Sequence, residues 1–158
     1  MEKKSLWAEV KDIPAFRTPV VILKEQAELL DVTTNSILRG EVKSFRVDVR
    51  KDEITLPLPS PLNIKLKKQI VPDKNGSMLG FSLFIIAPQM NYYSYCVLTI
   101  AYDPVEVYPV YLESTVLEGF VYCKDESNFI LILKQILSSE KIKTIIMSLI
   151  AQSQEMAS

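Results

Sequence analysis

The chain has 158 residues, of which 48% are hydrophobic and 23% are charged, and its formal net charge is −1. A chain of this length buries enough apolar surface to fold as one domain without a metal or a disulfide. The near-zero charge argues against a polyanion such as nucleic acid held by bulk electrostatics. The sequence contains no histidine. This excludes Ser-His-Asp and Cys-His pairs, imidazole metal ligands and a histidine general base.

The chain shows no targeting or cofactor signal. Its longest apolar runs, FILIL and VLTIAY, are far shorter than the roughly 20 residues that span a bilayer, and its charged start is not followed by an apolar run. Cys96 and Cys123 lack CxxC spacing, so we expect two reduced, buried thiols and no metal site. No phosphate-binding glycine motif occurs, and we expect no cofactor. The sequence therefore predicts a cytoplasmic protein that does not enter membranes.

The first long predicted element is a helix that begins after Thr18. Thr18 suits the N-cap and Pro19 the first helical position, and the apolar residues that follow recur at helical spacing (Val20, Leu23, Ala27 and Leu30). We expect the helix to end near Asp31. A weaker helix is predicted at Ser5–Val10, within residues 1–15, an end of the chain that we expect to be loosely ordered.

The period then changes to two. Phe45–Arg50 alternates apolar and polar residues, which predicts a strand with one face in water. Leu38 and Val42 lie on the opposite parity, and this change of phase indicates a bulge near Lys43 or Ser44. A second short strand is expected to begin at Ile54, after the turn at KDE.

Prolines and lysines mark the next segment. Pro57–Pro61 favours a stiff, extended crossover over a polyproline ligand for another domain. Lys65–Lys68 favours a lysine-protected edge strand over a phosphate contact. We expect this segment to form a hairpin, through the loop PDKNGS, with a buried strand at Phe81–Ala87.

Six of the seven tyrosines lie between Asn91 and Glu113. The pattern predicts strands at Tyr92–Tyr102 and Glu106–Leu112 joined by a turn at Asp103-Pro104, and a final strand at Gly119–Tyr122.

If the strand Phe81–Ala87 pairs with Tyr92–Tyr102 so that Ala87 faces Tyr92, both faces of this sheet are apolar. Phe81, Leu83, Ile85, Cys96, Leu98 and Ile100 form one face. The more aromatic face holds Phe84, Ile86, Tyr93, Tyr95 and Val97, and a two-residue turn adds Tyr108, Val110 and Leu112. A different turn length exchanges these assignments. One of the helices, a second copy of the chain, or a ligand or partner must cover the aromatic face, whose candidate contact residues are Phe84, Tyr93, Tyr95 and Tyr108.

The C-terminal part returns to helical spacing. Asp125 suits an N-cap, and an apolar stripe follows it (Phe129, Ile132, Leu133, Ile136 and Leu137). Ser138-Ser139 allows a break before a second helix or the continuation of a kinked one. Residues 153–158 are expected to be loosely ordered.

Acidic and thiol side chains give no firm catalytic candidate. Four acidic residues lie where turns and helix starts favour acids: Asp52, Glu53, Asp125 and Glu126. We therefore favour a structural role for them in turns and caps over a paired-carboxylate site. Cys123 precedes a helix start that could lower its pKa, which is a weak argument for a redox role. No lysine or arginine lies between Tyr92 and Glu113, so base stacking on the tyrosines is disfavoured.

These patterns predict a single α+β domain spanning residues 1–158. A mostly antiparallel sheet of five or six strands carries an N-terminal helix and a C-terminal helix or helix pair. The favoured function is a non-enzymatic, cytosolic protein–protein interaction module of the adaptor, chaperone-like or immunity-like kind that self-associates. The alternative is a small-molecule-binding domain or enzyme with a tyrosine-lined pocket between sheet and helices.

Overall fold

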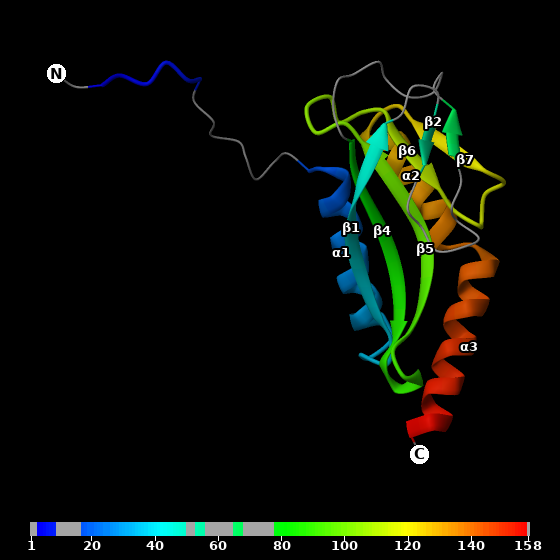
Figure 1. The fold of residues 1–158 in the computed structure, drawn as a ribbon. Coiled ribbons are helices and arrows are strands. Elements are labelled where there is room, and N and C mark those ends of the chain that lie inside the picture. Colours follow the sequence, from blue (N-terminus) through cyan, green and yellow to red (C-terminus); the bar gives the residue numbers. More distant parts are fainter. Residues whose placement is uncertain (1–2, 9–16, 50–52, 56–64, 68–77, 158) are drawn as a thin grey trace.

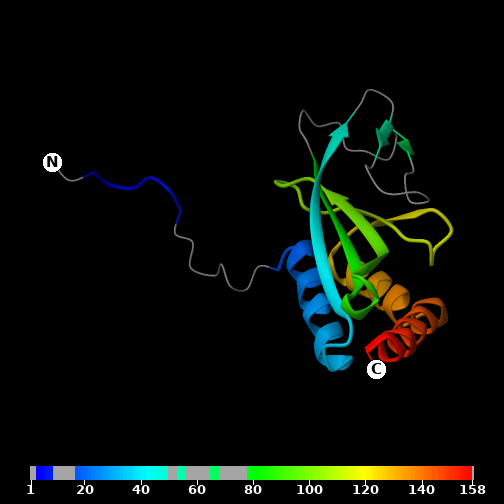
Figure 2. The ribbon, with the colours of Figure 1, turned by 60° about the horizontal axis from the view of Figure 1, so that its bottom comes forward.

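The computed structural model describes residues 3–8, 17–49, 53–55, 65–67 and 78–157. Along the chain the elements are α1 (Pro19–Thr33), β1 (Arg39–Val49), β2 (Glu53–Thr55), β3 (Lys65–Lys67), β4 (Met78–Ala87), the 3-10 helix η3 (Pro88–Met90), β5 (Tyr93–Tyr102), β6 (Val110–Glu113), β7 (Phe120–Cys123), α2 (Glu126–Leu137) and α3 (Glu140–Ala157). The strands form one antiparallel sheet in the order β3-β2-β1-β4-β5-β6-β7 (Figure 1). The three helices lie on one face of this sheet (Figure 2). The predicted α+β architecture is confirmed.

Helix α1 forms as its sequence predicts. Thr18 is the N-cap residue, with extended backbone, and Pro19 opens the helix. At the other end the Thr34 hydroxyl donates to the Leu30 carbonyl at 2.9 Å and accepts from the Leu38 N–H at 3.1 Å. This buried side chain thus joins the end of α1 to the residue that precedes β1.

Gly40 lets α1 pack closely against β1. A Cβ atom at Gly40 would lie 2.4 Å from the Cα atom and 2.5 Å from the carbonyl oxygen of Ala27. Real side chains do not approach this closely, so only glycine allows the helix to lie at this distance from the strand.

The bulge predicted near Lys43 is wrong. Strand β1 pairs with β4 without interruption from Arg39↔Ile86 to Val47↔Met78. The change of phase arises because Leu38, before the strand, and Val42, within it, face the helices, whereas Phe45 lies on the opposite face. The bulge lies instead in β5, where Leu83 pairs with Leu98 and Phe84 with Cys96, leaving Val97 without a partner.

The lysine-rich segment is an edge strand, as predicted, but its predicted hairpin with β4 is wrong. β3 pairs with β2 at the end of the sheet, and β4 lies between β1 and β5. The pattern of β4 explains its place, since a strand that is buried on both faces belongs in the middle of a sheet. The KDE turn falls partly, and the prolines 57–61 and the loop 72–77 wholly, outside the described residues.

The connection between β5 and β6 is longer than the two-residue turn predicted. The Asp103 carboxylate accepts from the N–H groups of Val105 and Glu106, both at 2.8 Å, and so forms a local turn of its own. The peptide bond between Tyr108 and Pro109 is cis, and proline has no N–H to donate to a strand partner. β6 therefore starts only at Val110.

Both C-terminal helices begin with the predicted caps. The Asp125 carboxylate accepts from the Asn128 N–H at 2.8 Å, and the Ser139 hydroxyl accepts from the Ile142 N–H at 3.3 Å, so Ser138-Ser139 separates two helices. Helix α3 continues to Ala157, through most of the 153–158 stretch that we expected to be loosely ordered, and Ser153 is buried.

At the other end of the chain, the helix predicted from Ser5 to Val10 is not formed in its described part. Residues 3–8 have no helical turn, and the Ser5 hydroxyl accepts from the Trp7 N–H at 3.2 Å. Local hydrogen bonds of this kind compete with helix formation.

Candidate functional site

The tyrosines at the start of β5 face the helices. Ala87 pairs with Tyr93 and Ile85 with Tyr95, so the predicted pairing of Ala87 with Tyr92 is wrong by one residue. The cause is the connection, which contains η3 and two residues at positive φ, Asn91 and Tyr92. A one-residue change of register exchanges the two faces of a strand.

The bulge at Val97 then reverses the effect of this shift for the rest of the strand. Beyond it, Leu98 pairs with Leu83 and Ile100 with Phe81. Because side chains alternate along a strand, Leu98 and Ile100 face the helices as well. The helix face of β5 is thus aromatic at one end and aliphatic at the other.

Tyr93 and Tyr95 form one wall of an open groove, and α3 forms the other. Met90, Tyr93, Tyr95, Thr144, Ile145, Ser148, Leu149 and Gln152 line this β5–α3 groove, which has a volume of about 470 Å³. Tyr93 is 49% exposed. The lining combines apolar side chains with hydroxyl and amide groups, so the groove can accept both apolar and hydrogen-bonding partners.

The end of the groove is fixed by a short polar network. The Tyr95 hydroxyl lies 3.1 Å from the Thr115 hydroxyl, and the Lys141 ammonium group donates to the Thr115 carbonyl at 3.3 Å. Thr115 thereby links β5 to the start of α3. This contact holds the Tyr95 ring in place and puts one positive charge beside the groove.

Next to the groove, β5 has a free edge. Strand β6 pairs with β5 only from Thr99 to Ala101, and the Ser114 hydroxyl donates to the Val97 carbonyl at 2.7 Å. Within the described residues, no strand pairs with Tyr93–Cys96 on that side. We call Tyr93–Cys96 the free edge of β5.

The free edge lacks the protection found elsewhere in the sheet. It carries no charged residue, whereas the edge strand β3 carries Lys65 and Lys67. At the opposite end of the sheet, β7 has only four residues and is followed directly by Lys124. Charges and short length are the usual means of preventing edge strands from pairing with other chains.

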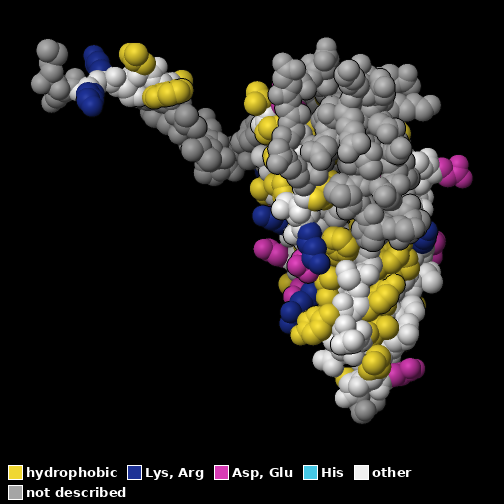
Figure 3. All heavy atoms as spheres, in the orientation of Figure 1, with side chains coloured by type: hydrophobic (Ala, Val, Ile, Leu, Met, Phe, Trp, Pro, Cys, Tyr) yellow, Lys and Arg dark blue, Asp and Glu magenta, His cyan; other side chains and the backbone are white. Residues whose placement is uncertain are grey.

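The four candidate contact residues do not form one surface. Tyr93 and Tyr95 lie together in the groove, but the register places Phe84 on the opposite face of the sheet, where the Lys43 ammonium group lies 5.1 Å from its ring centre. Figure 3 shows hydrophobic side chains reaching the surface there beside charged groups. Tyr108 lies in the β5–β6 connection, and burial together with the nearby acids, Glu126 foremost, raises its pKa to about 12.

A buried polar row crosses the face opposite the helices. Ser82, Thr99 and Glu113 are neighbours on β4, β5 and β6, and the Ser82 and Thr99 hydroxyl groups are 2.8 Å apart. Glu113 is 2% exposed, and neither of its carboxylate oxygens has a hydrogen-bond partner among the described residues. Burial raises its pKa to about 7. Sequence reasoning missed Glu113, although a charged residue at the end of an apolar strand pattern was a visible signal.

The two thiols are not activated. Both cysteines are free, Cys123 is buried and Cys96 is half-buried. Burial, and then the Asp125 carboxylate, raise the pKa of Cys123 to about 11, and burial also raises the pKa of Cys96. The suggestion that a helix start lowers the Cys123 pKa is therefore wrong, because burial and the Asp125 carboxylate raise it instead.

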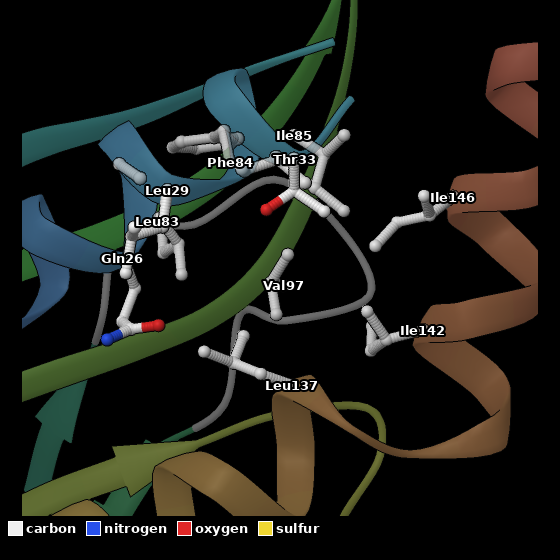
Figure 4. Close-up of a pocket in the computed structure, with 12 residues that line it drawn as sticks. Gln26, Leu29, Thr33, Leu83, Phe84, Ile85, Val97, Leu137, Ile142 and Ile146 are labelled. Carbon is white, nitrogen blue, oxygen red and sulfur yellow. The ribbon is translucent and has the colours of Figure 1, made fainter. Parts of the chain in front are cut away.

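A second hollow, the α1–α3 cavity, lies between these two helices beneath the sheet (Figure 4). It has a volume of about 180 Å³ and is lined by Gln26, Ala27, Leu29, Leu30, Thr33, Leu83, Phe84, Ile85, Val97, Leu137, Ile142 and Ile146. Figure 4 shows Ile142 and Ile146 projecting from α3 toward the sheet. Its walls are almost entirely apolar and contain no tyrosine.

In the part of the chain that the structure describes, no group of three His, Cys, Asp or Glu side chains is placed to hold a metal ion. None of the described helices is long and apolar enough to cross a membrane. Comparisons of the chain with protein-family models, with curated proteins and with solved structures found no match.

Proposed function

We propose that the protein is a non-catalytic interaction module that binds an extended segment of a partner protein along the free edge of β5. The supporting observation is the uncharged edge Tyr93–Cys96, which pairs with no described strand on this side and lies beside a groove that accepts side chains. Extended peptides bind such edges as an added strand, in which main-chain hydrogen bonds provide affinity and side-chain pockets provide specificity.

The β5–α3 groove defines the side chains that the partner brings. In an added strand every second residue points to the same face, so alternate partner residues lie over the groove. Met90, Ile145 and Leu149 favour apolar side chains there, while Ser148 and Gln152 offer hydrogen bonds. The expected partner segment is therefore extended, with apolar residues at alternate positions.

The same groove bears on the small-molecule alternative. Its volume falls in the range of ligand pockets, about 300–1,000 Å³, whereas the α1–α3 cavity is smaller than that range. A ligand pocket normally encloses most of its ligand, but this groove is open along a strand edge, which suits a polypeptide better. A cytosolic setting agrees with two cysteines that form no disulfide.

Two exposed tyrosines at different edges of the sheet provide a matched test. Tyr93 lies on the free edge and is 49% exposed, and Tyr122 lies on β7 and is 54% exposed. Lysine is a residue that natural edge strands use to prevent pairing. Affinity purification of the full chain from extracts of its source cells should recover a partner that Tyr93→Lys loses and Tyr122→Lys retains.

Hydrogen exchange provides the second measurement. In the complex, those backbone amides of residues 93–96 that point away from β4 should exchange more slowly than in the free chain, because a partner strand hydrogen-bonds to them. A partner that Tyr93→Lys still binds, with unchanged exchange at these amides, would show that the free edge is not the binding site.

A further inference from the structure

The free edge of β5 ends at a turn of the chain. Strand β6 pairs with β5 as far as Thr99, and the Ser114 hydroxyl then donates to the Val97 carbonyl at 2.7 Å. Directly after this contact the chain turns, and the Leu117 N–H donates to the Ser114 carbonyl at 3.2 Å. A strand added to Tyr93–Cys96 would lie end to end with β6, so it would meet this turn and could not continue past it.

A positive charge lies at this closed end of the edge. The Lys141 ammonium group donates to the Thr115 carbonyl at 3.3 Å, and the Thr115 hydroxyl lies 3.1 Å from that of Tyr95. Residues four and eleven positions after Lys141, Ile145 and Gln152, line the β5–α3 groove, so Lys141 lies on the same side of α3. An ammonium group has three donors, and a carbonyl leaves its charge uncompensated, so this site suits an anion.

Four other charged residues are close to this end in the sequence. On α3, Glu140 and Lys143 are turned about 100° and about 160° away from Lys141 around the helix axis. Glu113 is buried on the face of the sheet opposite the helices, and Glu118, in the turn region, is exposed. Lys141 is the charged side chain that a hydrogen bond places at the end of the groove.

This charge determines which end of an added strand lies at the turn. A strand antiparallel to β5 that began there would bring an α-ammonium group, which Lys141 repels. A strand parallel to β5 would end there, and its α-carboxylate would form a charge-assisted hydrogen bond with Lys141. An internal segment of a partner would have to turn sharply away from the edge at the same point.

We propose that the partner segment is the C-terminus of a protein chain, which adds parallel to β5 and places its α-carboxylate on the Lys141 ammonium group. This assignment rests on the proposed function, since it uses the same edge and groove. The lengths agree, because α3 from Lys141 to Gln152 covers about 16 Å and about five extended residues cover the same distance. Alternate residues of the segment point into the groove, where Ile145 and Leu149 accept apolar side chains. Capture of a C-terminal carboxylate is a recurring mode of peptide recognition.

Peptides with free C-termini provide the probes. A library of random sequences of about seven residues, slightly longer than the free edge, is displayed at the C-terminus of a carrier protein and selected on the full chain. Each selected sequence is then synthesised as the free acid and as the C-terminal amide, with a fluorescent label at its N-terminus. Fluorescence anisotropy gives both dissociation constants. We expect the free acid to bind at least about tenfold more tightly, because the amide lacks the charge.

Substitutions of Lys141 test the contact with the carboxylate. Lys141→Met removes the charge and keeps an unbranched side chain, so it should weaken binding of the free acid at least about tenfold and leave the affinity for the amide unchanged. Lys141→Arg should keep most of the affinity for the free acid. Equal weakening of acid and amide by Lys141→Met would show that Lys141 acts only through Thr115, and would overturn the inference. Lys143→Met and Glu118→Gln are matched controls and should not weaken binding of the free acid.

Tyr93→Lys separates this inference from the proposed function, because it should abolish binding of acid and amide alike. If acid and amide bound wild type equally and Tyr93→Lys lost both, the inference would be overturned and the free edge would remain the binding site. Peptides that Tyr93→Lys still binds would contradict both. A library without any binder would overturn the inference as well, while the partner recovered from cell extracts would still decide the proposed function.

Discussion

Replacing Glu113 by Gln should remove a pH dependence of folding that the wild-type chain carries. Burial raises the pKa of Glu113 from its ordinary value of 4.5 to about 7. Between these values the folded chain holds a proton that the unfolded chain has lost, so the free energy of unfolding falls as the pH rises through this window. A difference of this size corresponds to about 3 kcal/mol of stability, which is fully present below pH 4.5 and fully lost above pH 7.

Urea denaturation at a series of pH values from 5 to 8 measures this effect. Glu113→Gln is neutral throughout, so its unfolding free energy should exceed that of wild type by up to about 3 kcal/mol at pH 8, and the difference should shrink toward pH 5. The neighbouring Cys96 thiol does not titrate in this window, since burial raises its pKa. Glu118→Gln, at an exposed carboxylate, is the control and should leave the pH profile unchanged.

The outcome that would refute this reasoning is a constant difference. If wild type and Glu113→Gln changed in parallel between pH 5 and 8, the Glu113 carboxylate would have a solvated or hydrogen-bonded environment in the folded chain. If the variant were less stable than wild type at every pH, the Glu113 carboxylate would have a hydrogen-bonding or charged partner in the folded chain.

Three further predictions concern local structure. Gly40→Ala should lower the free energy of unfolding by about 1–3 kcal/mol or more, because the added Cβ would lie 2.4 Å from the Cα atom of Ala27. The thermal midpoint should fall by about 2–4 °C for each kcal/mol. Ala27→Gly should not restore the stability, because the atoms that the Cβ meets belong to the backbone. A wild-type midpoint would contradict this packing. Asp125→Ala should cost about 1 kcal/mol in urea denaturation through loss of the cap on the Asn128 N–H, and Asp125→Asn much less; equal losses would show that charge matters more than the hydrogen bond. Cys123 should react with iodoacetamide at pH 8 far more slowly in the native chain than in urea, since burial removes both access and thiolate; equal rates would contradict its burial.

The features that the sequence predicted well are those determined by neighbouring residues. Thr18-Pro19 and Asp125 mark helix starts because a cap acts within one turn of its own position. Lys65–Lys67 marks an edge because charges at alternate positions tolerate only a solvated strand. The α+β class followed from the order of these segments.

Only part of the candidate site could be predicted, because the site depends on the register between β4 and β5, which the length of their connection sets. Tyr93 and Tyr95 were predicted from the tyrosine-rich sequence of this strand, and the structure brings them together beside α3. Phe84 was grouped with them by a register that the longer turn and the bulge at Val97 do not allow. No local rule fixes the length of a turn such as that after η3, since packing against α3 also contributes to it.

The unpaired Val97 makes the orientation of the tyrosines sensitive to a single codon. A deletion at this position would leave the composition of β5 almost untouched, yet it would realign the strand so that either the aromatic or the aliphatic half turned to the wrong side of the sheet. Relatives of this protein that lack the extra residue would therefore present a different surface to their partners while keeping the same string of side chains. Chain length at one point, rather than residue identity, decides what this strand displays.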